Sequence, residues 1–288
     1  MRLVERRAVR ELQQNIKSHF EAWDTSAVVG GGANNGFYPF AVPWNDPSAT
    51  AVQVGTNNTT SGLLPLSSTP LTWSNMSSSC SLESPGVMRC QALCVILLGI
   101  PVCLPDYPSG QVTGIATQFV DPPGPGSFQF VGLSLGGSAN WTLNKAARRL
   151  EFSYSGFVNI GNLDIRVTAP QPSAFVTGWL ANNNWHQNAY YAFAPGFAID
   201  GNDLCGGQCF TINSFGASAT NKHAIVVMTG RSLPGIAPTP QAQRPVGAPF
   251  PVPLGEFLED ANSDGTALVF ELKARTTTFN DTPVAVRP

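Results

Sequence analysis

The sequence has few charged side chains and few histidines. Charged residues make up 12% of its 288 residues, about half the share of an average globular protein. The formal net charge is −2, so no strong positive potential would attract a nucleic acid backbone. Only three histidines are present, and their spacing does not predict a metal site or an acid–base pair. The sequence therefore predicts no nucleic-acid binding.

Long apolar runs are also missing. The longest, Ala92–Val102, is about half of the roughly 20 residues that a membrane-spanning helix needs. The N-terminus is charged and lacks the apolar region of a signal peptide. The apolar run lies close to cysteines, so we expect it to be a buried core segment.

Glycine and proline are abundant, at 28 and 24 residues, which favours many short strands joined by long turns. Residues 1–25 differ, because apolar side chains recur there at helical spacing. These side chains are Val9, Leu12, Ile16, Phe20 and Trp23. The sequence therefore predicts an N-terminal amphipathic helix, a Pro-rich loop over 26–70 and a β-rich region over 71–288, in one domain of class α+β.

Strand patterns are frequent in the β-rich region, where side chains alternate or run apolar over strand length. The predicted strands are 128–135, 149–158, 163–168, 224–228 and 267–272. A hairpin connection between the first two of these strands is expected at 144–149. Aromatic residues in the Pro-rich loop (Phe37, Tyr38, Phe40 and Trp44) predict a loop that is packed down by its own side chains.

Six cysteines predict an oxidising compartment and up to three disulfides. Cys205 and Cys209 are the expected pair, because Gly206 and Gly207 allow so short a loop to close. The pairing of the others stays open; they are Cys80, Cys90, Cys94 and Cys103. The alternative is a four-thiolate zinc site built from the two C-x3-C pairs, 90/94 and 205/209.

A calcium-loop pattern, D-x-N-x-D-G-x5-E, is formed by Asp260, Asn262, Asp264, Gly265 and Glu271. Alternating side chains of such a loop direct their oxygens at one cation. A strand-like segment follows, so the loop would be a structural clip and no EF-hand. The alternative is a β-turn rich in Asn, Asp and Gly. The sequence thus requires no cofactor and offers one candidate structural calcium site.

A G-x-S-x-G pattern surrounds Ser134, and Asp164 or Asp203 and then His223 follow in the order of a serine hydrolase. The nucleophile elbow needs a helix directly after the serine, and the residues that follow are poor helix formers. We therefore predict no enzymatic activity. A hydrolase that uses Ser134 is the third-ranked hypothesis for function, behind the two described below.

Four clustered aromatic residues define the second alternative, a secreted β-sandwich module that binds carbohydrate or protein. Trp179, Trp185, Tyr190 and Tyr191 would be the contact side chains. Core packing competes with this role, because aromatic side chains bury large areas.

Several later motifs together resemble the type IV pilin-like proteins, the minor pilins and pseudopilins of type IV pilus and type II secretion systems. The resemblance covers most of the chain and is densest over 175–285. It rests on Gly178-Trp179 through Trp185-His186, Tyr190–Pro195, Cys205 with Cys209, Lys222–Gly235, Phe257-Leu258-Glu259 with Asn262, and Phe279-Asn280-Asp281.

The resemblance implies a structural, minor subunit of a bacterial filament that acts in assembly or extracellular contact. It implies a pilin-like fold, in which the N-terminal helix packs on an antiparallel sheet with long Pro/Gly-rich loops. Its partners would be other pilin-like subunits and the inner membrane. The membrane contact would use an apolar half-helix ahead of residue 1, which this sequence does not contain. The protein would lie in the cell envelope before assembly and in an extracellular filament afterwards. Some family members clip a C-terminal loop with Ca²⁺, which would fall on Asp260, Asn262, Asp264 and Glu271.

Overall fold

The structure of the chain is a computed structural model. It describes residues 2–24, 36–43, 59–66, 71–78, 80–91, 93–98, 100–104, 111–118, 130–131, 138–155, 164–169, 174–230, 233 and 254–287. Its helices are α1 (Arg2–Asp24), α2 (Gly178–Asn182) and α3 (Leu254–Phe257), with the 3-10 turns η2 (Trp185–Asn188), η3 (Pro195–Phe197) and η4 (Asp260–Ser263).

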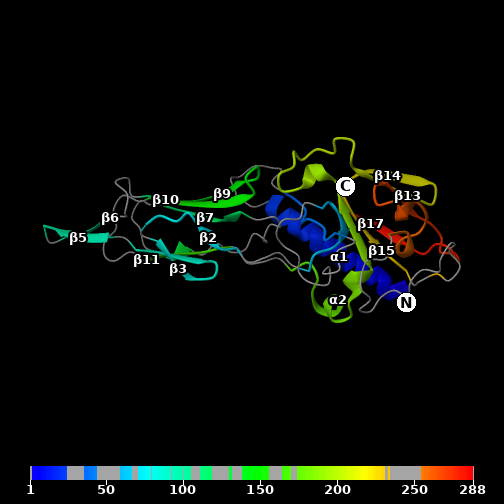
Figure 1. Cartoon of the computed structure of the whole chain (residues 1–288), viewed down its shortest axis with the longest axis horizontal. Helices are drawn as coiled ribbons and strands as arrows, with labels where there is room; N and C mark the ends of the chain where they lie inside the picture. The colour runs from blue at the N-terminus through cyan, green and yellow to red at the C-terminus, as the bar shows by residue number, and fades with distance from the viewer. Residues whose placement is uncertain are drawn as a thin grey trace. The chain divides into compact units, whose positions relative to one another are not determined.

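Strands dominate the rest of the described chain (Figure 1). They are β1 (Ser61–Leu63), β2 (Trp73–Ser74), β3 (Cys80–Ser84), β4 (Val87–Gln91), β5 (Leu93–Leu97), β6 (Ile100–Leu104), β7 (Gln111–Gln118), β8 (Phe130–Val131), β9 (Ser138–Asn144), β10 (Arg149–Ser155), β11 (Asp164–Thr168), β12 (Ala189–Phe193), β13 (Phe210–Ser214), β14 (Ala217–Lys222), β15 (Ala224–Met228), β16 (Val269–Leu272) and β17 (Thr282–Arg287).

The predicted fold class is wrong. The sequence predicts a pilin-like α+β fold with an antiparallel sheet on the N-terminal helix, whereas the structure is mostly β with one long helix. The strands of the described residues are distributed over five sheets, and one of these contains a parallel pair. Local alternation indicates where a strand is, but pairing is decided by contacts between distant segments. The number of sheets therefore could not be obtained from the strand patterns.

The chain divides into two compact units. Unit 1 comprises Met1–Glu21, Gly36–Ser68 and Ala174–Pro288, and unit 2 comprises Ala22–Asn35 and Thr69–Ser173. Most of unit 2 is thus one continuous stretch, whereas unit 1 is assembled from both ends of the chain. The segment boundaries at 25 and 70 stay predictions.

The main sheet of unit 1 has the order β1-β12-β15-β17. Its two central strands, β12 and β15, are buried at every position, which explains the unbroken apolar sequence of β15. The helix α1 is present where the sequence predicts it, and the side chains of its apolar stripe are buried. Gln13 of this helix donates a hydrogen bond of 2.5 Å to the carbonyl oxygen of Ala285 in β17.

The second sheet of unit 1 has the order β14-β13-β16. β13 and β14 form an antiparallel hairpin, and β16 runs parallel to β13. β14 is exposed at nearly every position and has no large apolar side chain, so it lacks the pattern by which a strand is predicted. The described part of the Pro-rich loop buries Phe37, Tyr38 and Phe40, as expected; Trp44 lies outside the described residues.

Unit 2 contains the sheets β2-β7-β10-β9 and β3-β4-β11-β8 and the hairpin β5-β6. Trp73, Trp141 and Phe152 meet in its core, with ring centroids 5.1 to 6.2 Å apart. The predicted connection at 144–149 is a hairpin, but it joins β10 to β9, a strand that the sequence analysis missed.

Among the residues that the structure describes, we find no helix with the length and apolar character needed to cross a membrane.

Candidate functional site

A buried polar network lies near the C-terminus, in unit 1. We call it the C-terminal clip and define it as Glu259, Asn262, Asn280 and Asp281, each at most 4% exposed. Glu259 Oε2 accepts hydrogen bonds of 3.0 Å from the main-chain N–H groups of Asn280 and Asp281. Asp281 Oδ2 accepts one of 2.8 Å from the N–H of Glu259. Each carboxylate therefore accepts hydrogen bonds from main-chain N–H groups at or next to the other acidic residue. These bonds offset the cost of burying the two polar groups.

Asn262 connects the clip to the edge of a sheet. Its amide Nδ2 donates to the carbonyl oxygen of Glu271 at 3.1 Å and to Asp281 Oδ2 at 3.3 Å. Its Oδ1 accepts the N–H of Glu271 at 2.7 Å. Glu271 belongs to β16, which is an edge strand of the sheet β14-β13-β16. The side chain thus satisfies both main-chain groups of Glu271, which would otherwise be open to another strand.

Gly230, which follows β15, completes the surroundings of the clip. A Cβ atom at this position would lie 2.0 Å from Asn280 Oδ1, so no larger residue fits without displacing Asn280. Next to it, the Thr229 hydroxyl donates to the carbonyl oxygen of Asn188 at 3.0 Å. The clip therefore fixes the end of β15, the η4 turn and the start of β17 against one another.

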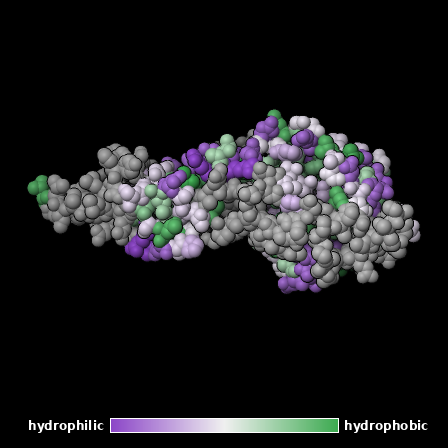
Figure 2. All heavy atoms as spheres, in the orientation of Figure 1, coloured by the Kyte–Doolittle hydropathy of each residue, from purple (hydrophilic) through white to green (hydrophobic). Residues whose placement is uncertain are grey.

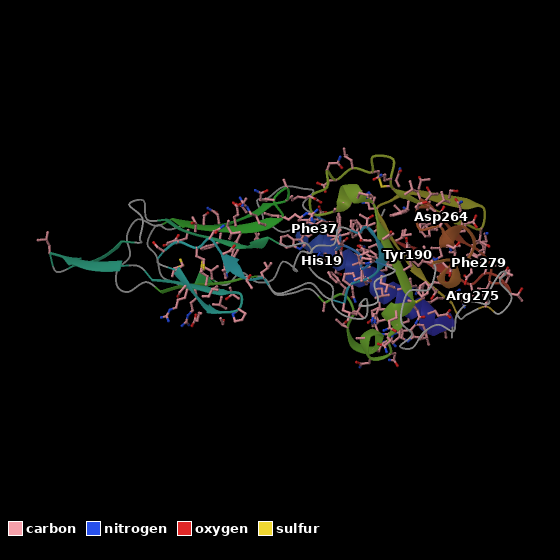
Figure 3. All side chains as sticks on the ribbon, in the orientation of Figure 1. His19, Phe37, Tyr190, Asp264, Arg275 and Phe279 are labelled. Atoms are coloured by element: carbon pink, nitrogen blue, oxygen red, sulfur yellow. A yellow bond between two sulfur atoms is a disulfide. The ribbon has the colours of Figure 1, made fainter. Side chains whose placement is uncertain are left out.

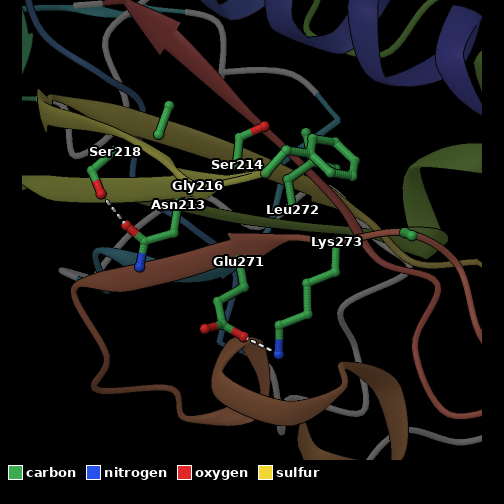
Figure 4. Close-up of a pocket in the computed structure, with 10 residues that line it drawn as sticks. Asn213, Ser214, Gly216, Ser218, Glu271, Leu272 and Lys273 are labelled. Atoms are coloured by element: carbon green, nitrogen blue, oxygen red, sulfur yellow. Dashed lines mark hydrogen bonds and ion pairs between the residues drawn. The ribbon is translucent and has the colours of Figure 1, made fainter.

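The four candidate calcium ligands lie on this side of unit 1 but have other partners. Asn262 is buried in the clip, and Asp264 Oδ1 accepts hydrogen bonds from the hydroxyl and N–H of Thr266, at 2.7 and 2.9 Å. These bonds lower the pKa of Asp264. Lys273 pairs with Glu271 (Figure 4) and, at 3.3 Å, with Asp260. The hydrogen bond with Glu271 is the main cause that raises the pKa of Lys273.

A calcium ion would have to displace these partners. Among the described residues, the carboxylates of Asp260, Asp264 and Glu271 do not converge to within 4.8 Å as a group of three. Calcium at this loop stays a prediction.

Two disulfides are present in the described residues. Cys205 is bonded to Cys209, the expected pair, and Cys80 is bonded to Cys90 across β3 and β4. Sulfur atoms in disulfides are not thiolates and do not ligate zinc, so the four-cysteine zinc alternative is wrong. A ring nitrogen of His223 lies within 4.8 Å of the sulfurs of Cys205 and Cys209, but the same bond occupies them.

Cys94 and Cys103 lie directly opposite each other in the main-chain register of β5 and β6. Their side chains are outside the part of the chain that the structure describes.

The four aromatic candidates separate into two kinds. Tyr190 and Tyr191 are at most 2% exposed, and the Tyr191 hydroxyl donates to the carbonyl oxygen of Pro39 at 3.1 Å. These two side chains belong to the core. Trp179 and Trp185 are half-buried, with ring centroids 6.2 Å apart.

Trp179 is also tied to helix α1. Its Nε1 donates to Glu11 Oε2 at 2.5 Å, and the guanidinium of Arg7 lies 4.7 Å from its ring centroid. One face of this ring is therefore occupied by a cation within the chain itself.

The residues of the hydrolase alternative are only partly described. Ser134 and the side chain of Asp164 lie outside the described residues. His223 stacks on Phe197, with ring centroids 3.8 Å apart. Hydrolase activity through Ser134 stays untested by this arrangement.

Three pockets lie around the sheet β14-β13-β16. One, of about 460 Å³, is bounded by the β13–β14 hairpin and by Glu271, Leu272 and Lys273 (Figure 4). A second, of about 410 Å³, is lined by Arg6, Phe215, Lys273, Arg275 and Asp281 among others. The third, of about 260 Å³, lies at the other end of β13 and is lined by Tyr190, Phe193, Pro195, Phe210 and Leu268 among others.

Two cations of the second pocket, Lys273 and Arg275, are paired with nearby acids. Arg275 pairs with the buried Glu5 of α1 and donates to the Thr282 hydroxyl at 3.5 Å; Arg275 and Phe279 can be located in Figure 3. Over the described part of unit 1 visible in Figure 2, hydrophilic and hydrophobic side chains are interspersed.

Comparison with known proteins gives no relative: no family model matches the chain, and neither the curated proteins nor the solved structures contain a match.

Proposed function

We propose that this protein is a structural subunit of a filament of the type IV pilus or type II secretion kind. In this proposal it acts as a minor subunit in assembly or extracellular contact. It lies in the bacterial cell envelope before assembly and outside the cell afterwards. This role does not require the pilin-like fold class, which the structure contradicts.

The observation that carries the proposal is the composition of the C-terminal clip. Gly230, Glu259, Asn262, Asn280 and Asp281 all lie in the motifs on which the resemblance to pilin-like proteins rests, and only Asn262 had a predicted role there, as a calcium ligand. They are separated by up to about 50 positions in the sequence, yet they meet in one buried network. A shared buried network gives these scattered motifs a common physical cause, which supports the resemblance.

The start of helix α1 gives a second support. Leu3 is 81% exposed and Val4 is 41% exposed, whereas Val9, Leu12 and Ile16 are buried. The first turn of α1 therefore has apolar side chains that are exposed to solvent, unlike those of the later turns. An exposed apolar helix end fits contact with other subunits or with a membrane. We accordingly expect an apolar helical segment ahead of Met1 in the native protein.

The test is the N-terminus of the protein isolated from its native envelope fraction, determined by mass spectrometry. The proposal expects a mature form that starts about 20 residues or more before Met1, with an apolar first segment and a methylated first residue. A mature form that starts at Met1, or directly after a conventional signal peptide, would contradict the proposal.

The secreted binding module is the second candidate, and one observation favours it. Trp179 and Trp185 are half-buried next to the exposed amides of Asn183 and Asn184, and rings beside amides suit polar ligands. Binding on a glycan array that is lost in Trp185→Ala and kept in Trp141→Ala would support this function. If neither the wild type nor either variant binds any glycan on the array, the carbohydrate-binding function is contradicted.

A further inference from the structure

The β13–β14 hairpin ends in an exposed aromatic side chain. Its two tip residues, Phe215 and Gly216, have φ angles of 48° and 89°, the left-handed pair that a two-residue hairpin turn requires. Asparagine and glycine adopt this conformation readily, whereas a bulky residue does so at a cost. Phe215 is nevertheless 75% exposed. Neither local conformation nor core packing accounts for a phenylalanine here, and this combination points to a role in contact with another molecule.

The opposite end of the same sheet has a pocket of matching size. It is the pocket of about 260 Å³ lined by Tyr190, Phe193, Pro195, Phe210 and Leu268, with Ser61 and Thr266 among its polar residues. An apolar cavity of roughly 150 Å³ is enough to hold a benzene ring. The pocket therefore has room for one phenyl side chain.

The exposed ring and the pocket are connected by one short strand. Phe210, which lines the pocket, is the first residue of β13, and Phe215 directly follows its last residue. Five strand residues span about 17 Å. A projection at one end of a sheet and a receptor at the other cannot meet within one molecule, but they can meet between successive molecules.

One pair of opposite charges is available at the two ends. Arg6 lines the pocket beside Phe215, where Lys273 and Arg275 are already paired with acids of their own copy. At the other end, Asp264 is exposed next to Gly265 and Thr266, which line the receiving pocket. Asp264 also acts on Tyr190 in that pocket: burial raises the pKa of Tyr190, and the charge of Asp264 raises it further while a hydrogen bond with Ser61 opposes both. Figure 3 labels Tyr190 and Asp264.

We propose that Phe215 of one copy inserts into the Tyr190–Phe210–Leu268 pocket of a second copy of this chain. The inference rests on the proposed function and names a contact between its subunits. The two surfaces of the contact differ, so it is a heterologous contact, and repeating it produces an open series of copies in place of a closed dimer. Arg6 of the first copy then faces Asp264 of the second.

The experiment uses cysteines placed beside the two surfaces. Ala217 lies two positions after Phe215. Thr266 lines the receiving pocket. Both residues are exposed. In the purified chain carrying Ala217→Cys and Thr266→Cys, mild oxidation should give a ladder of cross-linked species on a non-reducing gel. Mixing the two single variants should give a cross-linked dimer, whereas each single variant alone should give none by this route.

Phe215→Ala in the double-cysteine chain should lower the cross-linking rate about tenfold or more, because the insertion buries an aromatic side chain. Leu98→Ala is the matched control, since Leu98 is also an exposed apolar residue with a left-handed backbone (98% exposed, φ 56°) in the turn between β5 and β6. It should leave the ladder unchanged. A ladder that persists in Phe215→Ala, or no ladder in the parent, would overturn the contact.

Charge reversal tests the orientation. Arg6→Glu should weaken cross-linking, and Arg6→Glu combined with Asp264→Arg should restore it; absence of restoration would overturn the head-to-tail arrangement. The inference and the proposed function can fail separately. An apolar N-terminus found on the native protein together with cross-linking that ignores Phe215 would keep the filament role and reject this contact. A ladder that depends on Phe215, from a native chain that starts at Met1, would keep the contact and reject the pilin-like role.

Discussion

Unit 1 and unit 2 bury their side chains in different ways. Unit 1 has two strands, β12 and β15, that are buried at every position, and it adds the C-terminal clip. Unit 2 alternates buried and less buried positions along β10 and relies on an aromatic cluster. A disulfide crosslinks its strands β3 and β4. Unit 1 also has a disulfide, Cys205–Cys209, but that bond closes a local loop and does not link two strands. We therefore expect the covalent bond to contribute more to unit 2 than to unit 1.

Removing the clip should produce the largest effect, and it should fall on unit 1. Asp281→Ala leaves the N–H of Glu259 and one amide contact of Asn262 without their acceptor in a buried place. The expected loss in free energy of unfolding is about 3–5 kcal/mol, measured by urea denaturation. Asp281→Asn keeps an acceptor and should lose less. A loss below about 1 kcal/mol in Asp281→Ala would show that the clip does not stabilise unit 1.

Removing each disulfide should destabilise only the unit that contains it. Cys80 and Cys90 are 10 positions apart, and Cys205 and Cys209 are 4 apart. Loop-closure entropy gives about 3 kcal/mol for the first and about 2 kcal/mol for the second.

Serine at both Cys80 and Cys90 should therefore increase protease cleavage within Thr69–Ser173 before it affects unit 1. The matched control carries serine at Cys205 and Cys209, which should leave unit 2 protected. Equal cleavage of both units in the first variant would contradict the comparison.

Acid should weaken unit 1 through His19. This side chain is 5% exposed and lies against Phe37 and Phe175, with ring centroids 6.0 and 5.1 Å away. Burial lowers its pKa from 6.5 to about 3. Between these pH values the folded state binds fewer protons than the unfolded state. The contribution of neutral His19 to the free energy of unfolding is therefore fully present above about pH 6.5 and decreases as the pH falls toward 3.

At pH 5 the loss from His19 should be about 2 kcal/mol relative to pH 7. His19→Gln removes the titrating group, so the pH dependence of its unfolding free energy should be flatter by that amount. Parallel curves for the wild type and His19→Gln would show that His19 does not carry this acid sensitivity.

The smallest effect is expected at the surface of unit 1. Lys273 pairs with Asp260 and Glu271, but its side chain is 45% exposed. Solvent screening reduces such pairs to less than about 1 kcal/mol. Lys273→Ala should therefore shift the urea midpoint only slightly, and the shift should disappear in 1 M salt. A large loss would mean that Lys273 belongs functionally to the clip.

Local features of the fold were predictable from the sequence. The stripe from Val9 to Trp23 fixes the position of α1, because its period of three to four residues admits no other regular element. Alternation or apolar runs identified β10, β11, β15 and β16. Gly206 and Gly207 indicated the short loop that the Cys205–Cys209 disulfide closes.

Long-range features were not predictable. β14 has no large apolar side chain and pairs with β13 as a hairpin, so its own sequence carries no strand signal. The turn at Phe215-Gly216 was missed because phenylalanine is an unusual residue for that left-handed position. Asn262 fits a cation ligand and an edge-strand partner equally well in sequence, and only the position of Glu271 distinguishes the two roles.

The C-terminal clip also sets an order of events during synthesis. Unit 2 draws its strands from Thr69–Ser173 and has everything that it pairs with once that stretch has emerged. Unit 1 must wait for Asn280, Asp281 and the last strand, β17, before its buried carboxylates and the outer edge of β15 find their partners. Because domains fold as units when their residues become available, a nascent chain cut short before Asn280 would carry a finished unit 2 and an open unit 1. Residues 280–288 thus complete unit 1: without them, the edge of β15 that pairs with β17 is left open, and we expect such a fragment to be more sensitive to proteases than the full chain.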